Sequence, residues 1–244
     1  MVDGEGELKL TAIAHGLDLS SPYTWDVTKA LASLTKRSPG RHMSELYGSY
    51  YAKTQPKRYA KKQGDTPPHE RFGAGMALEE MLELGLKARV NTQKQEEFIR
   101  PGEFETAHTD ECERSKKKRT KGCGCACGGG VLFSPDLSIF NGVNRTGEIK
   151  LHSMSHKGAP HKVGNTYNGL DPKFDKFFTQ LKVYNYHLGT PYGRLYSFSM
   201  REMVYFNEPS ILLAWDIEFT EQEMWEEWEL MRRHGVAEGL LLAA

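Results

Sequence analysis

The segment 135–151 constrains the fold more than any other part of the chain. Two runs of strand-forming residues flank the turn signal Asn141-Gly142, so we predict a β-hairpin. Glu148 and Lys150 lie two positions apart on its second strand and therefore face the same side of the sheet. Pairing within the hairpin can bring Asp136, at the start of the first strand, to that side as well. The sequence thus predicts two carboxylates and an ammonium at one sheet edge.

This combination of side chains is typical of a divalent-metal site. Asp136 and Glu148 are expected to hold one or two Mg²⁺ or Mn²⁺ ions, with the backbone carbonyl of Ile149 as a further ligand. A metal in such a site lowers the pKa of bound water and stabilises negative charge on phosphorus. Lys150 is expected to position or deprotonate that water. These are the requirements of phosphodiester hydrolysis.

Three segments of the chain together resemble the PD-(D/E)XK nuclease superfamily. The first is Asp136 followed by Glu148-Ile149-Lys150. The second, Gln180-Leu-Lys-Val-Tyr184, is similar to the Gln-x-x-x-Tyr motif of the RecB-type, lambda-exonuclease-like branch. The third, residues 75–83, is similar to the first helix of that branch, which carries another acidic residue or a histidine. The resemblance covers residues 69–219 and follows the family order.

The resemblance implies both a fold and an activity. It implies an α/β fold in which a mixed central β-sheet is flanked by helices, forming a restriction-endonuclease-like nuclease core. It implies a metal-dependent deoxyribonuclease, an exonuclease of phage or mobile-element type that serves recombination, repair or phage DNA processing. Asp136, Glu148 and Lys150 would be catalytic, whereas Gln180 and Tyr184 would orient the active site and the DNA.

The expected first helix, residues 69–89, offers several candidates for a third acid. Glu79 shares a three- and four-residue spacing with Gly75, Leu82 and Leu86, so it interrupts a stripe that should face inward. A carboxylate on a buried stripe is costly unless it is paired or binds a metal. We therefore predict Glu79 as a metal ligand, and we expect Glu80 and Glu83 to lie on the solvated side.

All four cysteines fall in one segment, at positions 112, 123, 125 and 127. Cys112, Cys123, Cys125 and Cys127 could form a structural Zn²⁺ site with four thiolates. Their spacing matches no familiar zinc module, which favours free thiols on a flexible glycine-rich tip. An iron–sulfur centre is a further alternative, but in RecB-type nucleases that have one, a single cysteine precedes the nuclease motifs. Here all four precede Asp136.

Net charge limits how the chain could bind nucleic acid. The 32 basic residues balance the 32 acidic residues, so any attraction to DNA must come from local patches. Residues 114–121 hold six basic residues in eight, and residues 53–62 hold five in ten. Tyrosines are interleaved with cations over residues 44–62, which we interpret as a packed helix and, alternatively, as a surface that stacks on single strands.

The remaining patterns define an expected organisation. We predict an N-terminal helical and basic region over residues 1–68, and a nuclease core over 69–244 that contains a Cys/Lys-rich insertion at 91–130. Residues 194–204 and 211–219 read as strands, and Thr220 with Glu223 forms a capping box before a final helix. No signal peptide or membrane span is recognisable, so a cytoplasmic location in a bacterium or a phage-infected cell is expected.

Two other functions remain open from the sequence. One is a non-catalytic nucleic-acid-binding module, or a subunit of a nuclease complex, stabilised by a cysteine-bound metal. The other is a partner-binding protein whose acidic, Trp-rich last helix contacts a helicase or recombination protein. The intact set of two acids and a lysine speaks against a decayed nuclease.

Overall fold

The structure is a computed structural model, and it describes only part of the chain. The described residues are 38–56, 77, 79–85, 96–117, 119–152, 161–163, 166–168, 175–199 and 212–243. Apart from Ala77 they belong to one compact unit. Most of the predicted N-terminal region, including residues 1–37, lies outside them, so its boundary at residue 68 stays a prediction.

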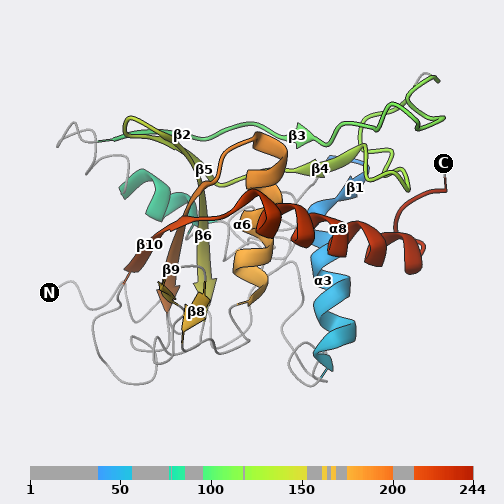
Figure 1. Ribbon diagram of the computed structural model, residues 1–244. Helices are drawn as coiled ribbons and strands as arrows, with labels where there is room; N and C mark the ends of the chain where they lie inside the picture. The colour runs from blue at the N-terminus through green and yellow to red at the C-terminus, as the bar shows by residue number, and fades with distance from the viewer. Residues whose placement is uncertain are drawn as a thin grey trace, which may run out of the picture. The chain divides into compact units, whose positions relative to one another are not determined.

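A mixed five-stranded sheet forms the centre of this unit (Figure 1). In spatial order its strands are β10 (Leu212–Glu218), β9 (Tyr192–Ser199), β6 (Asn144–His152), β5 (Leu137–Phe140) and β2 (Glu97–Ile99). Only β6 and β9 run parallel. A separate two-stranded pair joins β7 (His161–Val163) to β8 (Thr166–Asn168). The predicted mixed sheet is confirmed.

The predicted hairpin is also present, as strands β5 and β6. Its register pairs Leu137 with Gly147 and Phe140 with Asn144. Gly142 closes the turn with φ of 94°, a left-handed conformation that glycine adopts without a steric cost. One face of the hairpin forms a buried apolar cluster that contains Leu137, Ile139 and Ile149. Successive side chains of each strand therefore point to opposite faces of the sheet.

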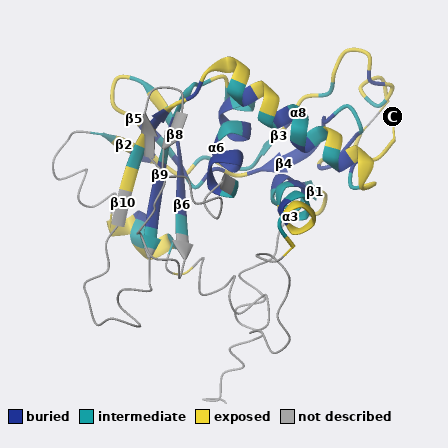
Figure 2. Cartoon of the chain, turned by 60° about the horizontal axis from the view of Figure 1, so that its bottom comes forward, coloured by how far each residue is buried: buried dark blue, intermediate teal, exposed yellow. Residues whose placement is uncertain are grey.

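Helices cover this sheet. Helix α6 (Asp175–Leu188) packs on β6 and β9, and both α3 (Met43–Thr54) and α8 (Glu221–Ala237) pack on α6. Buried residues of α6 meet the sheet, whereas the outer side of α8 is exposed (Figure 2). The helical residues 79–85 place Leu82 against the cluster of Leu137, Ile139 and Ile149. None of the helices in the described part of the chain is long and apolar enough to cross a membrane.

Helix α8 begins as the sequence predicts. The backbone N–H of Glu223 donates to Thr220 Oγ1 at 3.1 Å, and the Glu223 carboxylate accepts the Thr220 N–H at 2.8 Å. Trp228 is buried on the inner side, whereas Trp225 is about half exposed. Helix α8 therefore packs in the core through its inner side.

The predicted insertion contributes strands to two sheets. Its residues 97–99 are β2, the edge strand beside β5, and β3 (Phe104–Glu105) pairs with β4 (Val131–Phe133). Strand β4 pairs on its other side with β1 (Arg41–His42). Strands of two or three residues are too short to show an alternating pattern, which is why the sequence did not reveal them. Residues 106–130, between β3 and β4, are called the cysteine loop below.

Candidate active site

The hairpin brings the two predicted carboxylates together. Because Leu137 pairs with Gly147, Asp136 lies beside Glu148 at the start of β5. The Asp136 carboxylate accepts the backbone N–H of Ile149 at 2.7 Å. Lys150 Nζ lies 2.5 Å from Glu148 Oε2 and 3.8 Å from Asp136 Oδ2. The three residues predicted as catalytic thus form one cluster.

Glu148 is the most constrained member of this cluster. Its side chain has no solvent exposure, and its Oε1 has no hydrogen-bond partner within the described part of the chain. Burial raises its pKa well above the usual range, and the negative charge of Asp136 adds to this, whereas Lys150 opposes it. A buried carboxylate oxygen without a partner is unfavourable unless something further binds there.

Lys150 remains a cation in this environment. Burial alone would lower its pKa, but the carboxylates of Glu148 and Asp136 outweigh burial and raise the pKa above its ordinary value. The residue therefore supplies a fixed positive charge between two acids. Positioning water and neutralising charge are therefore the roles that its geometry favours.

The predicted third acid joins the same cluster. Glu79 shares a hydrogen bond with Asp136, and its pKa is raised to about 8 by burial and by the charge of Asp136. The charges of Lys150 and Arg100 oppose this shift. Glu79, Asp136, Glu148 and Lys150 are together called the acidic centre below.

One prediction about this helix is wrong. Glu80 is exposed as expected, but Glu83 is only 6 % exposed and lies 3.7 Å from Arg100. The reason is helical geometry: residues four apart share a face, so Glu83 follows Glu79 toward the interior. Arg100, just after β2, lies near both Glu79 and Glu83, and it was not identified from the sequence.

The predicted Gln-x-x-x-Tyr pair lies on α6 with its side chains in contact. Gln180 Nε2 donates to the Tyr184 hydroxyl at 3.0 Å, and both side chains are buried. Burial raises the pKa of Tyr184 well above its usual range, and the charge of Glu148 raises it further. Phe133 stacks on the Tyr184 ring with centroids 5.1 Å apart. This pair therefore borders the acidic centre.

Two more residues near the acidic centre were missed by sequence reasoning. Tyr47 on α3 lies close enough to influence the pKa of Lys150, and Lys176 on α6 has its pKa lowered by burial and then by the charge of Lys150. Lys176 could have been found, because it precedes Gln180 and Tyr184 at a spacing of four on the same helix face.

The side chains of the acidic centre suit a hard divalent cation. Asp136 interacts with both Glu79 and Glu148, and Glu148 Oε1 has no hydrogen-bond partner among the described residues. Oxygen donors of this kind fit Mg²⁺ or Mn²⁺. Ile149 follows Glu148 on β6, with its N–H bound to Asp136 and its side chain on the opposite face, and its carbonyl as a metal ligand stays a prediction.

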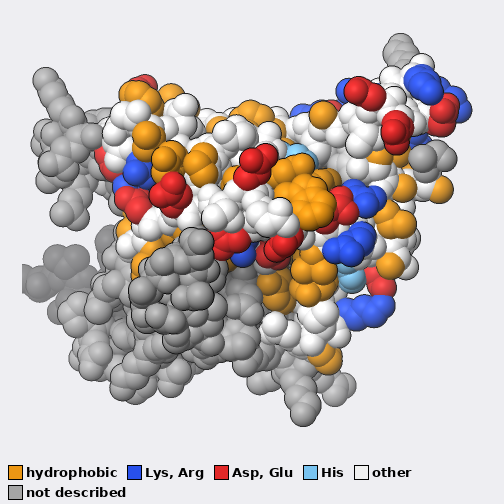
Figure 3. Space-filling model, viewed as in Figure 1, with side chains coloured by type: hydrophobic (Ala, Val, Ile, Leu, Met, Phe, Trp, Pro, Cys, Tyr) orange, Lys and Arg blue, Asp and Glu red, His pale blue; other side chains and the backbone are white. Residues whose placement is uncertain are grey.

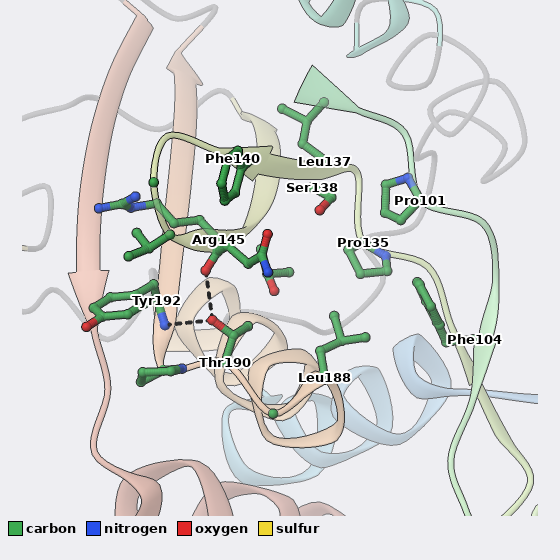
Figure 4. Close-up of a pocket in the computed structure, with 16 residues that line it drawn as sticks. Pro101, Phe104, Pro135, Leu137, Ser138, Phe140, Arg145, Leu188, Thr190 and Tyr192 are labelled. Carbon is green, nitrogen blue, oxygen red and sulfur yellow. Dashed lines mark hydrogen bonds between the residues drawn. The ribbon is translucent and has the colours of Figure 1, made fainter. Parts of the chain in front are cut away.

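A separate hollow lies beside the hairpin. This cavity of about 540 Å³ is bordered by residues that include Pro135, Leu137, Arg145 and Tyr192. Figure 4 shows Thr190 at its base, where its hydroxyl donates to the Asn144 carbonyl at 2.8 Å. Asp136, Glu148 and Lys150 do not line it, so the cavity does not identify the acidic centre.

A second group of ligand-type side chains lies in the cysteine loop. His108, Cys112, Cys125 and Cys127 place their ligand atoms within 4.8 Å of one another, and the group could hold a metal ion such as zinc. We call these four residues the cysteine cluster. The structure departs here from the predicted set of four thiols, because His108 takes the place of Cys123. Cys123 instead contacts the opposite ring nitrogen of His108.

Comparison with known proteins does not show a family. No protein-family model and no curated protein matches the chain. Among solved structures, the crystal structure of SSO0001 is similar with a TM-score of 0.42 and 13 % identity, over 86 % of this chain and 87 % of that one. A likeness at this level carries no argument about function, which must be argued from the site.

Proposed function

We propose that this chain is a metal-dependent deoxyribonuclease with a restriction-endonuclease-like core. The observation that carries the proposal is Glu148, a fully buried carboxylate next to Asp136 and Lys150, one oxygen of which has no hydrogen-bond partner among the residues that the structure describes. Such an arrangement costs stability unless it serves a ligand. The resemblance to PD-(D/E)XK nucleases, carried by Asp136 and Glu148-Ile149-Lys150, supports the same activity.

The chemistry follows from the residues of the acidic centre. Asp136 and Glu148 would hold Mg²⁺ or Mn²⁺, with Glu79 as a further ligand. The metal would supply an activated water and charge stabilisation at phosphorus. Lys150, held as a cation between the acids, would orient that water and neutralise charge on the phosphate. Gln180 would keep the Tyr184 hydroxyl oriented toward the carboxylates.

The fold supports this proposal through its order of elements. The hairpin β5–β6 carries the acids, β9 runs parallel to β6, and α6 carries Gln180 and Tyr184 against these strands. This is the arrangement that the resemblance implies for a nuclease core. DNA as substrate, exonucleolytic cutting and a helicase or recombination partner rest on the resemblance and belong to the same proposal.

A basic surface supports nucleic acid as the substrate. Lys and Arg side chains gather, together with some acidic ones, at the tip of the cysteine loop (Figure 3). The described basic residues of this loop include Arg114, Lys116, Lys117, Arg119 and Lys121. Because the chain has no net charge, such a local patch is the kind of feature that would attract a phosphate backbone.

Cleavage of labelled linear and circular DNA with Mg²⁺, Mn²⁺ or EDTA tests the proposal. We expect linear DNA to be degraded with either cation, no cleavage in EDTA, and no cleavage by Asp136→Asn. Glu97→Gln, at an exposed carboxylate on β2, is the matched control and should keep full activity. DNA binding without cleavage under all conditions would refute the nuclease and favour a non-catalytic nucleic-acid-binding protein.

A further inference from the structure

The geometry points to a structural zinc site formed by His108, Cys112, Cys125 and Cys127. His108 Nδ1 lies 3.4 Å from Cys112 Sγ and 3.3 Å from Cys127 Sγ, and the Sγ atoms of Cys112 and Cys125 are 3.2 Å apart. In a tetrahedral zinc site with bonds of about 2.3 Å to sulfur, neighbouring ligand atoms lie about 3.8 Å apart. Because the three distances in the structure are within about 0.6 Å of this value, and all four ligand atoms lie within 4.8 Å of one another, small side-chain shifts would accommodate the ion.

The ligand types select zinc over the cations of the acidic centre. Three thiolates and an imidazole are soft or borderline donors, which bind Zn²⁺ strongly and Mg²⁺ poorly. The sulfur atoms converge without bonding, since none of the four cysteines is in a disulfide and a disulfide requires about 2.05 Å between sulfurs. Four protein ligands fill the coordination shell, so this site leaves no open position for catalysis.

Cys123 supports the site from outside the ligand set. If His108 ligates through Nδ1, its other nitrogen carries the proton and donates to Cys123 Sγ, which lies 3.2 Å from Nε2. Metal-bound histidines usually make such a second hydrogen bond, which holds the ring in place. Cys123 is thus a positioning residue and not a ligand, although it shares the Cys-x-Cys-x-Cys run with two ligands.

The three glycines after Cys127 show that this loop is packed and is not an exposed tip. A Cβ atom at Gly129 would lie 2.5 Å from the His108 ring, and one at Gly130 would lie 2.4 Å from Cys123 Sγ. At Gly128, whose φ is +90°, a Cβ would lie 2.4 Å from the Trp228 ring. Side chains are therefore excluded wherever the backbone passes the cluster or α8. The expectation of a flexible glycine-rich tip does not fit these contacts.

The ion would join the two ends of the cysteine loop, one of which is hydrogen-bonded to the C-terminal segment. His108 and Cys112 follow β3, whereas Cys125 and Cys127 precede β4. The backbone beside Cys125 pairs with Leu242 near the C-terminus, because Leu242 N–H donates to the Gly124 carbonyl at 2.6 Å and Ala126 N–H donates to the Leu242 carbonyl at 2.5 Å. Zinc would thus fasten the base of the basic stretch 114–121 and the C-terminal segment to β4.

Metal analysis of the purified full chain tests this site independently of nuclease activity. We expect about one zinc per chain. Cys112→Ser and Cys125→Ser should lose it, whereas Cys123→Ser should retain it with an affinity lower by about 10- to 100-fold. Cobalt added to chelator-treated wild-type protein should give the visible absorption bands of a tetrahedral thiolate site. This measurement uses the wild-type protein only, so it does not depend on whether the variants fold.

Several results would overturn the proposal. Absence of zinc together with rapid reaction of all four thiols in the native protein would show free cysteines. Iron with acid-labile sulfide would show a cluster of another kind. If Cys123→Ser loses as much zinc as Cys112→Ser, then Cys123 is a ligand. The assignment of His108 as the fourth ligand would then be wrong.

Discussion

The acidic centre and the cysteine cluster each bring side-chain ligand atoms close together, but different structural elements position those side chains. The acidic centre draws its side chains from a helix, from β6 and from the residue before β5, and the pairing of β5 with β6 positions Asp136, Glu148 and Lys150. The cysteine cluster draws its side chains from one loop, where backbone turns and close-packed glycines set them. The first arrangement offers hard oxygens and a fixed cation, and the second offers soft sulfurs. The two regions should therefore hold different metals and respond to different changes.

The largest expected effect is the loss of DNA cleavage in a Glu148 variant that keeps most of its thermal stability. Glu148→Gln should lower DNA cleavage by at least about 100-fold, because a ligand is lost. The glutamine amide oxygen can still accept a hydrogen bond from Lys150, which also keeps the Asp136 carboxylate 3.8 Å away, so thermal stability in EDTA should fall far less than in Lys150→Ala. Cleavage rates and melting curves measure both. Near-normal turnover, or a large fall in melting temperature, would contradict the assignment.

Lys150→Ala should cost stability as well as activity. Glu148 would lose its cationic partner while remaining buried, and breaking a buried pair in this way typically destabilises a protein by about 3–5 kcal/mol. Denaturant unfolding in EDTA measures the free-energy change. The double variant Lys150→Met, Glu148→Gln serves as the control and should recover most of the lost stability. If it does not, the pair is not the cause.

Metal affinity at the acidic centre should depend on pH through Glu79. Its pKa is raised from 4.5 to about 8, so between these values the folded, metal-free protein holds a proton that the unfolded chain has lost. Its contribution to stability therefore falls as pH rises from 4.5 to 8. A metal must displace this proton, so Mn²⁺ affinity should increase from pH 6 to pH 8 and then level off. Calorimetry should show the same trend largely flattened in Glu79→Gln.

The smallest effects should distinguish Glu83 from Glu80. Glu83→Gln weakens an ion pair with the partly exposed Arg100 and should cost at most about 1 kcal/mol, with cleavage reduced only a few-fold. Glu80→Gln, at an exposed position of the same helix, should change neither property. Equal and large losses of activity in both variants would show that the helix is oriented differently.

The two regions also differ in how far the sequence could predict them. A period of two along a strand placed Glu148 and Lys150 on one side, and the turn at Asn141-Gly142 set the pairing with Asp136. The loop has no such period. His108 was missed because its approach to the cysteines depends on turns and on Gly129, although its position four residues before Cys112 was a local signal.

Misjudged residues near the acidic centre have equally specific causes. Glu83 was placed on the solvated side although it lies one helical turn after Glu79, and its partner Arg100 directly follows a strand too short to recognise. Tyr47 was interpreted as a packing residue, and α3 does pack on α6 and α8, but its position near Lys150 depends on tertiary contacts that no local pattern reveals.

Metal occupancy of Glu148→Gln tests most directly that this chain has two chemically distinct metal sites. Wild-type protein and variant would be titrated with Mn²⁺ after their zinc content has been measured. We predict that the variant loses Mn²⁺ binding at the acidic centre and keeps about one zinc per chain at the cysteine cluster. Unchanged Mn²⁺ binding in the variant would contradict the account, because the buried carboxylate of Glu148 would then not be a metal ligand.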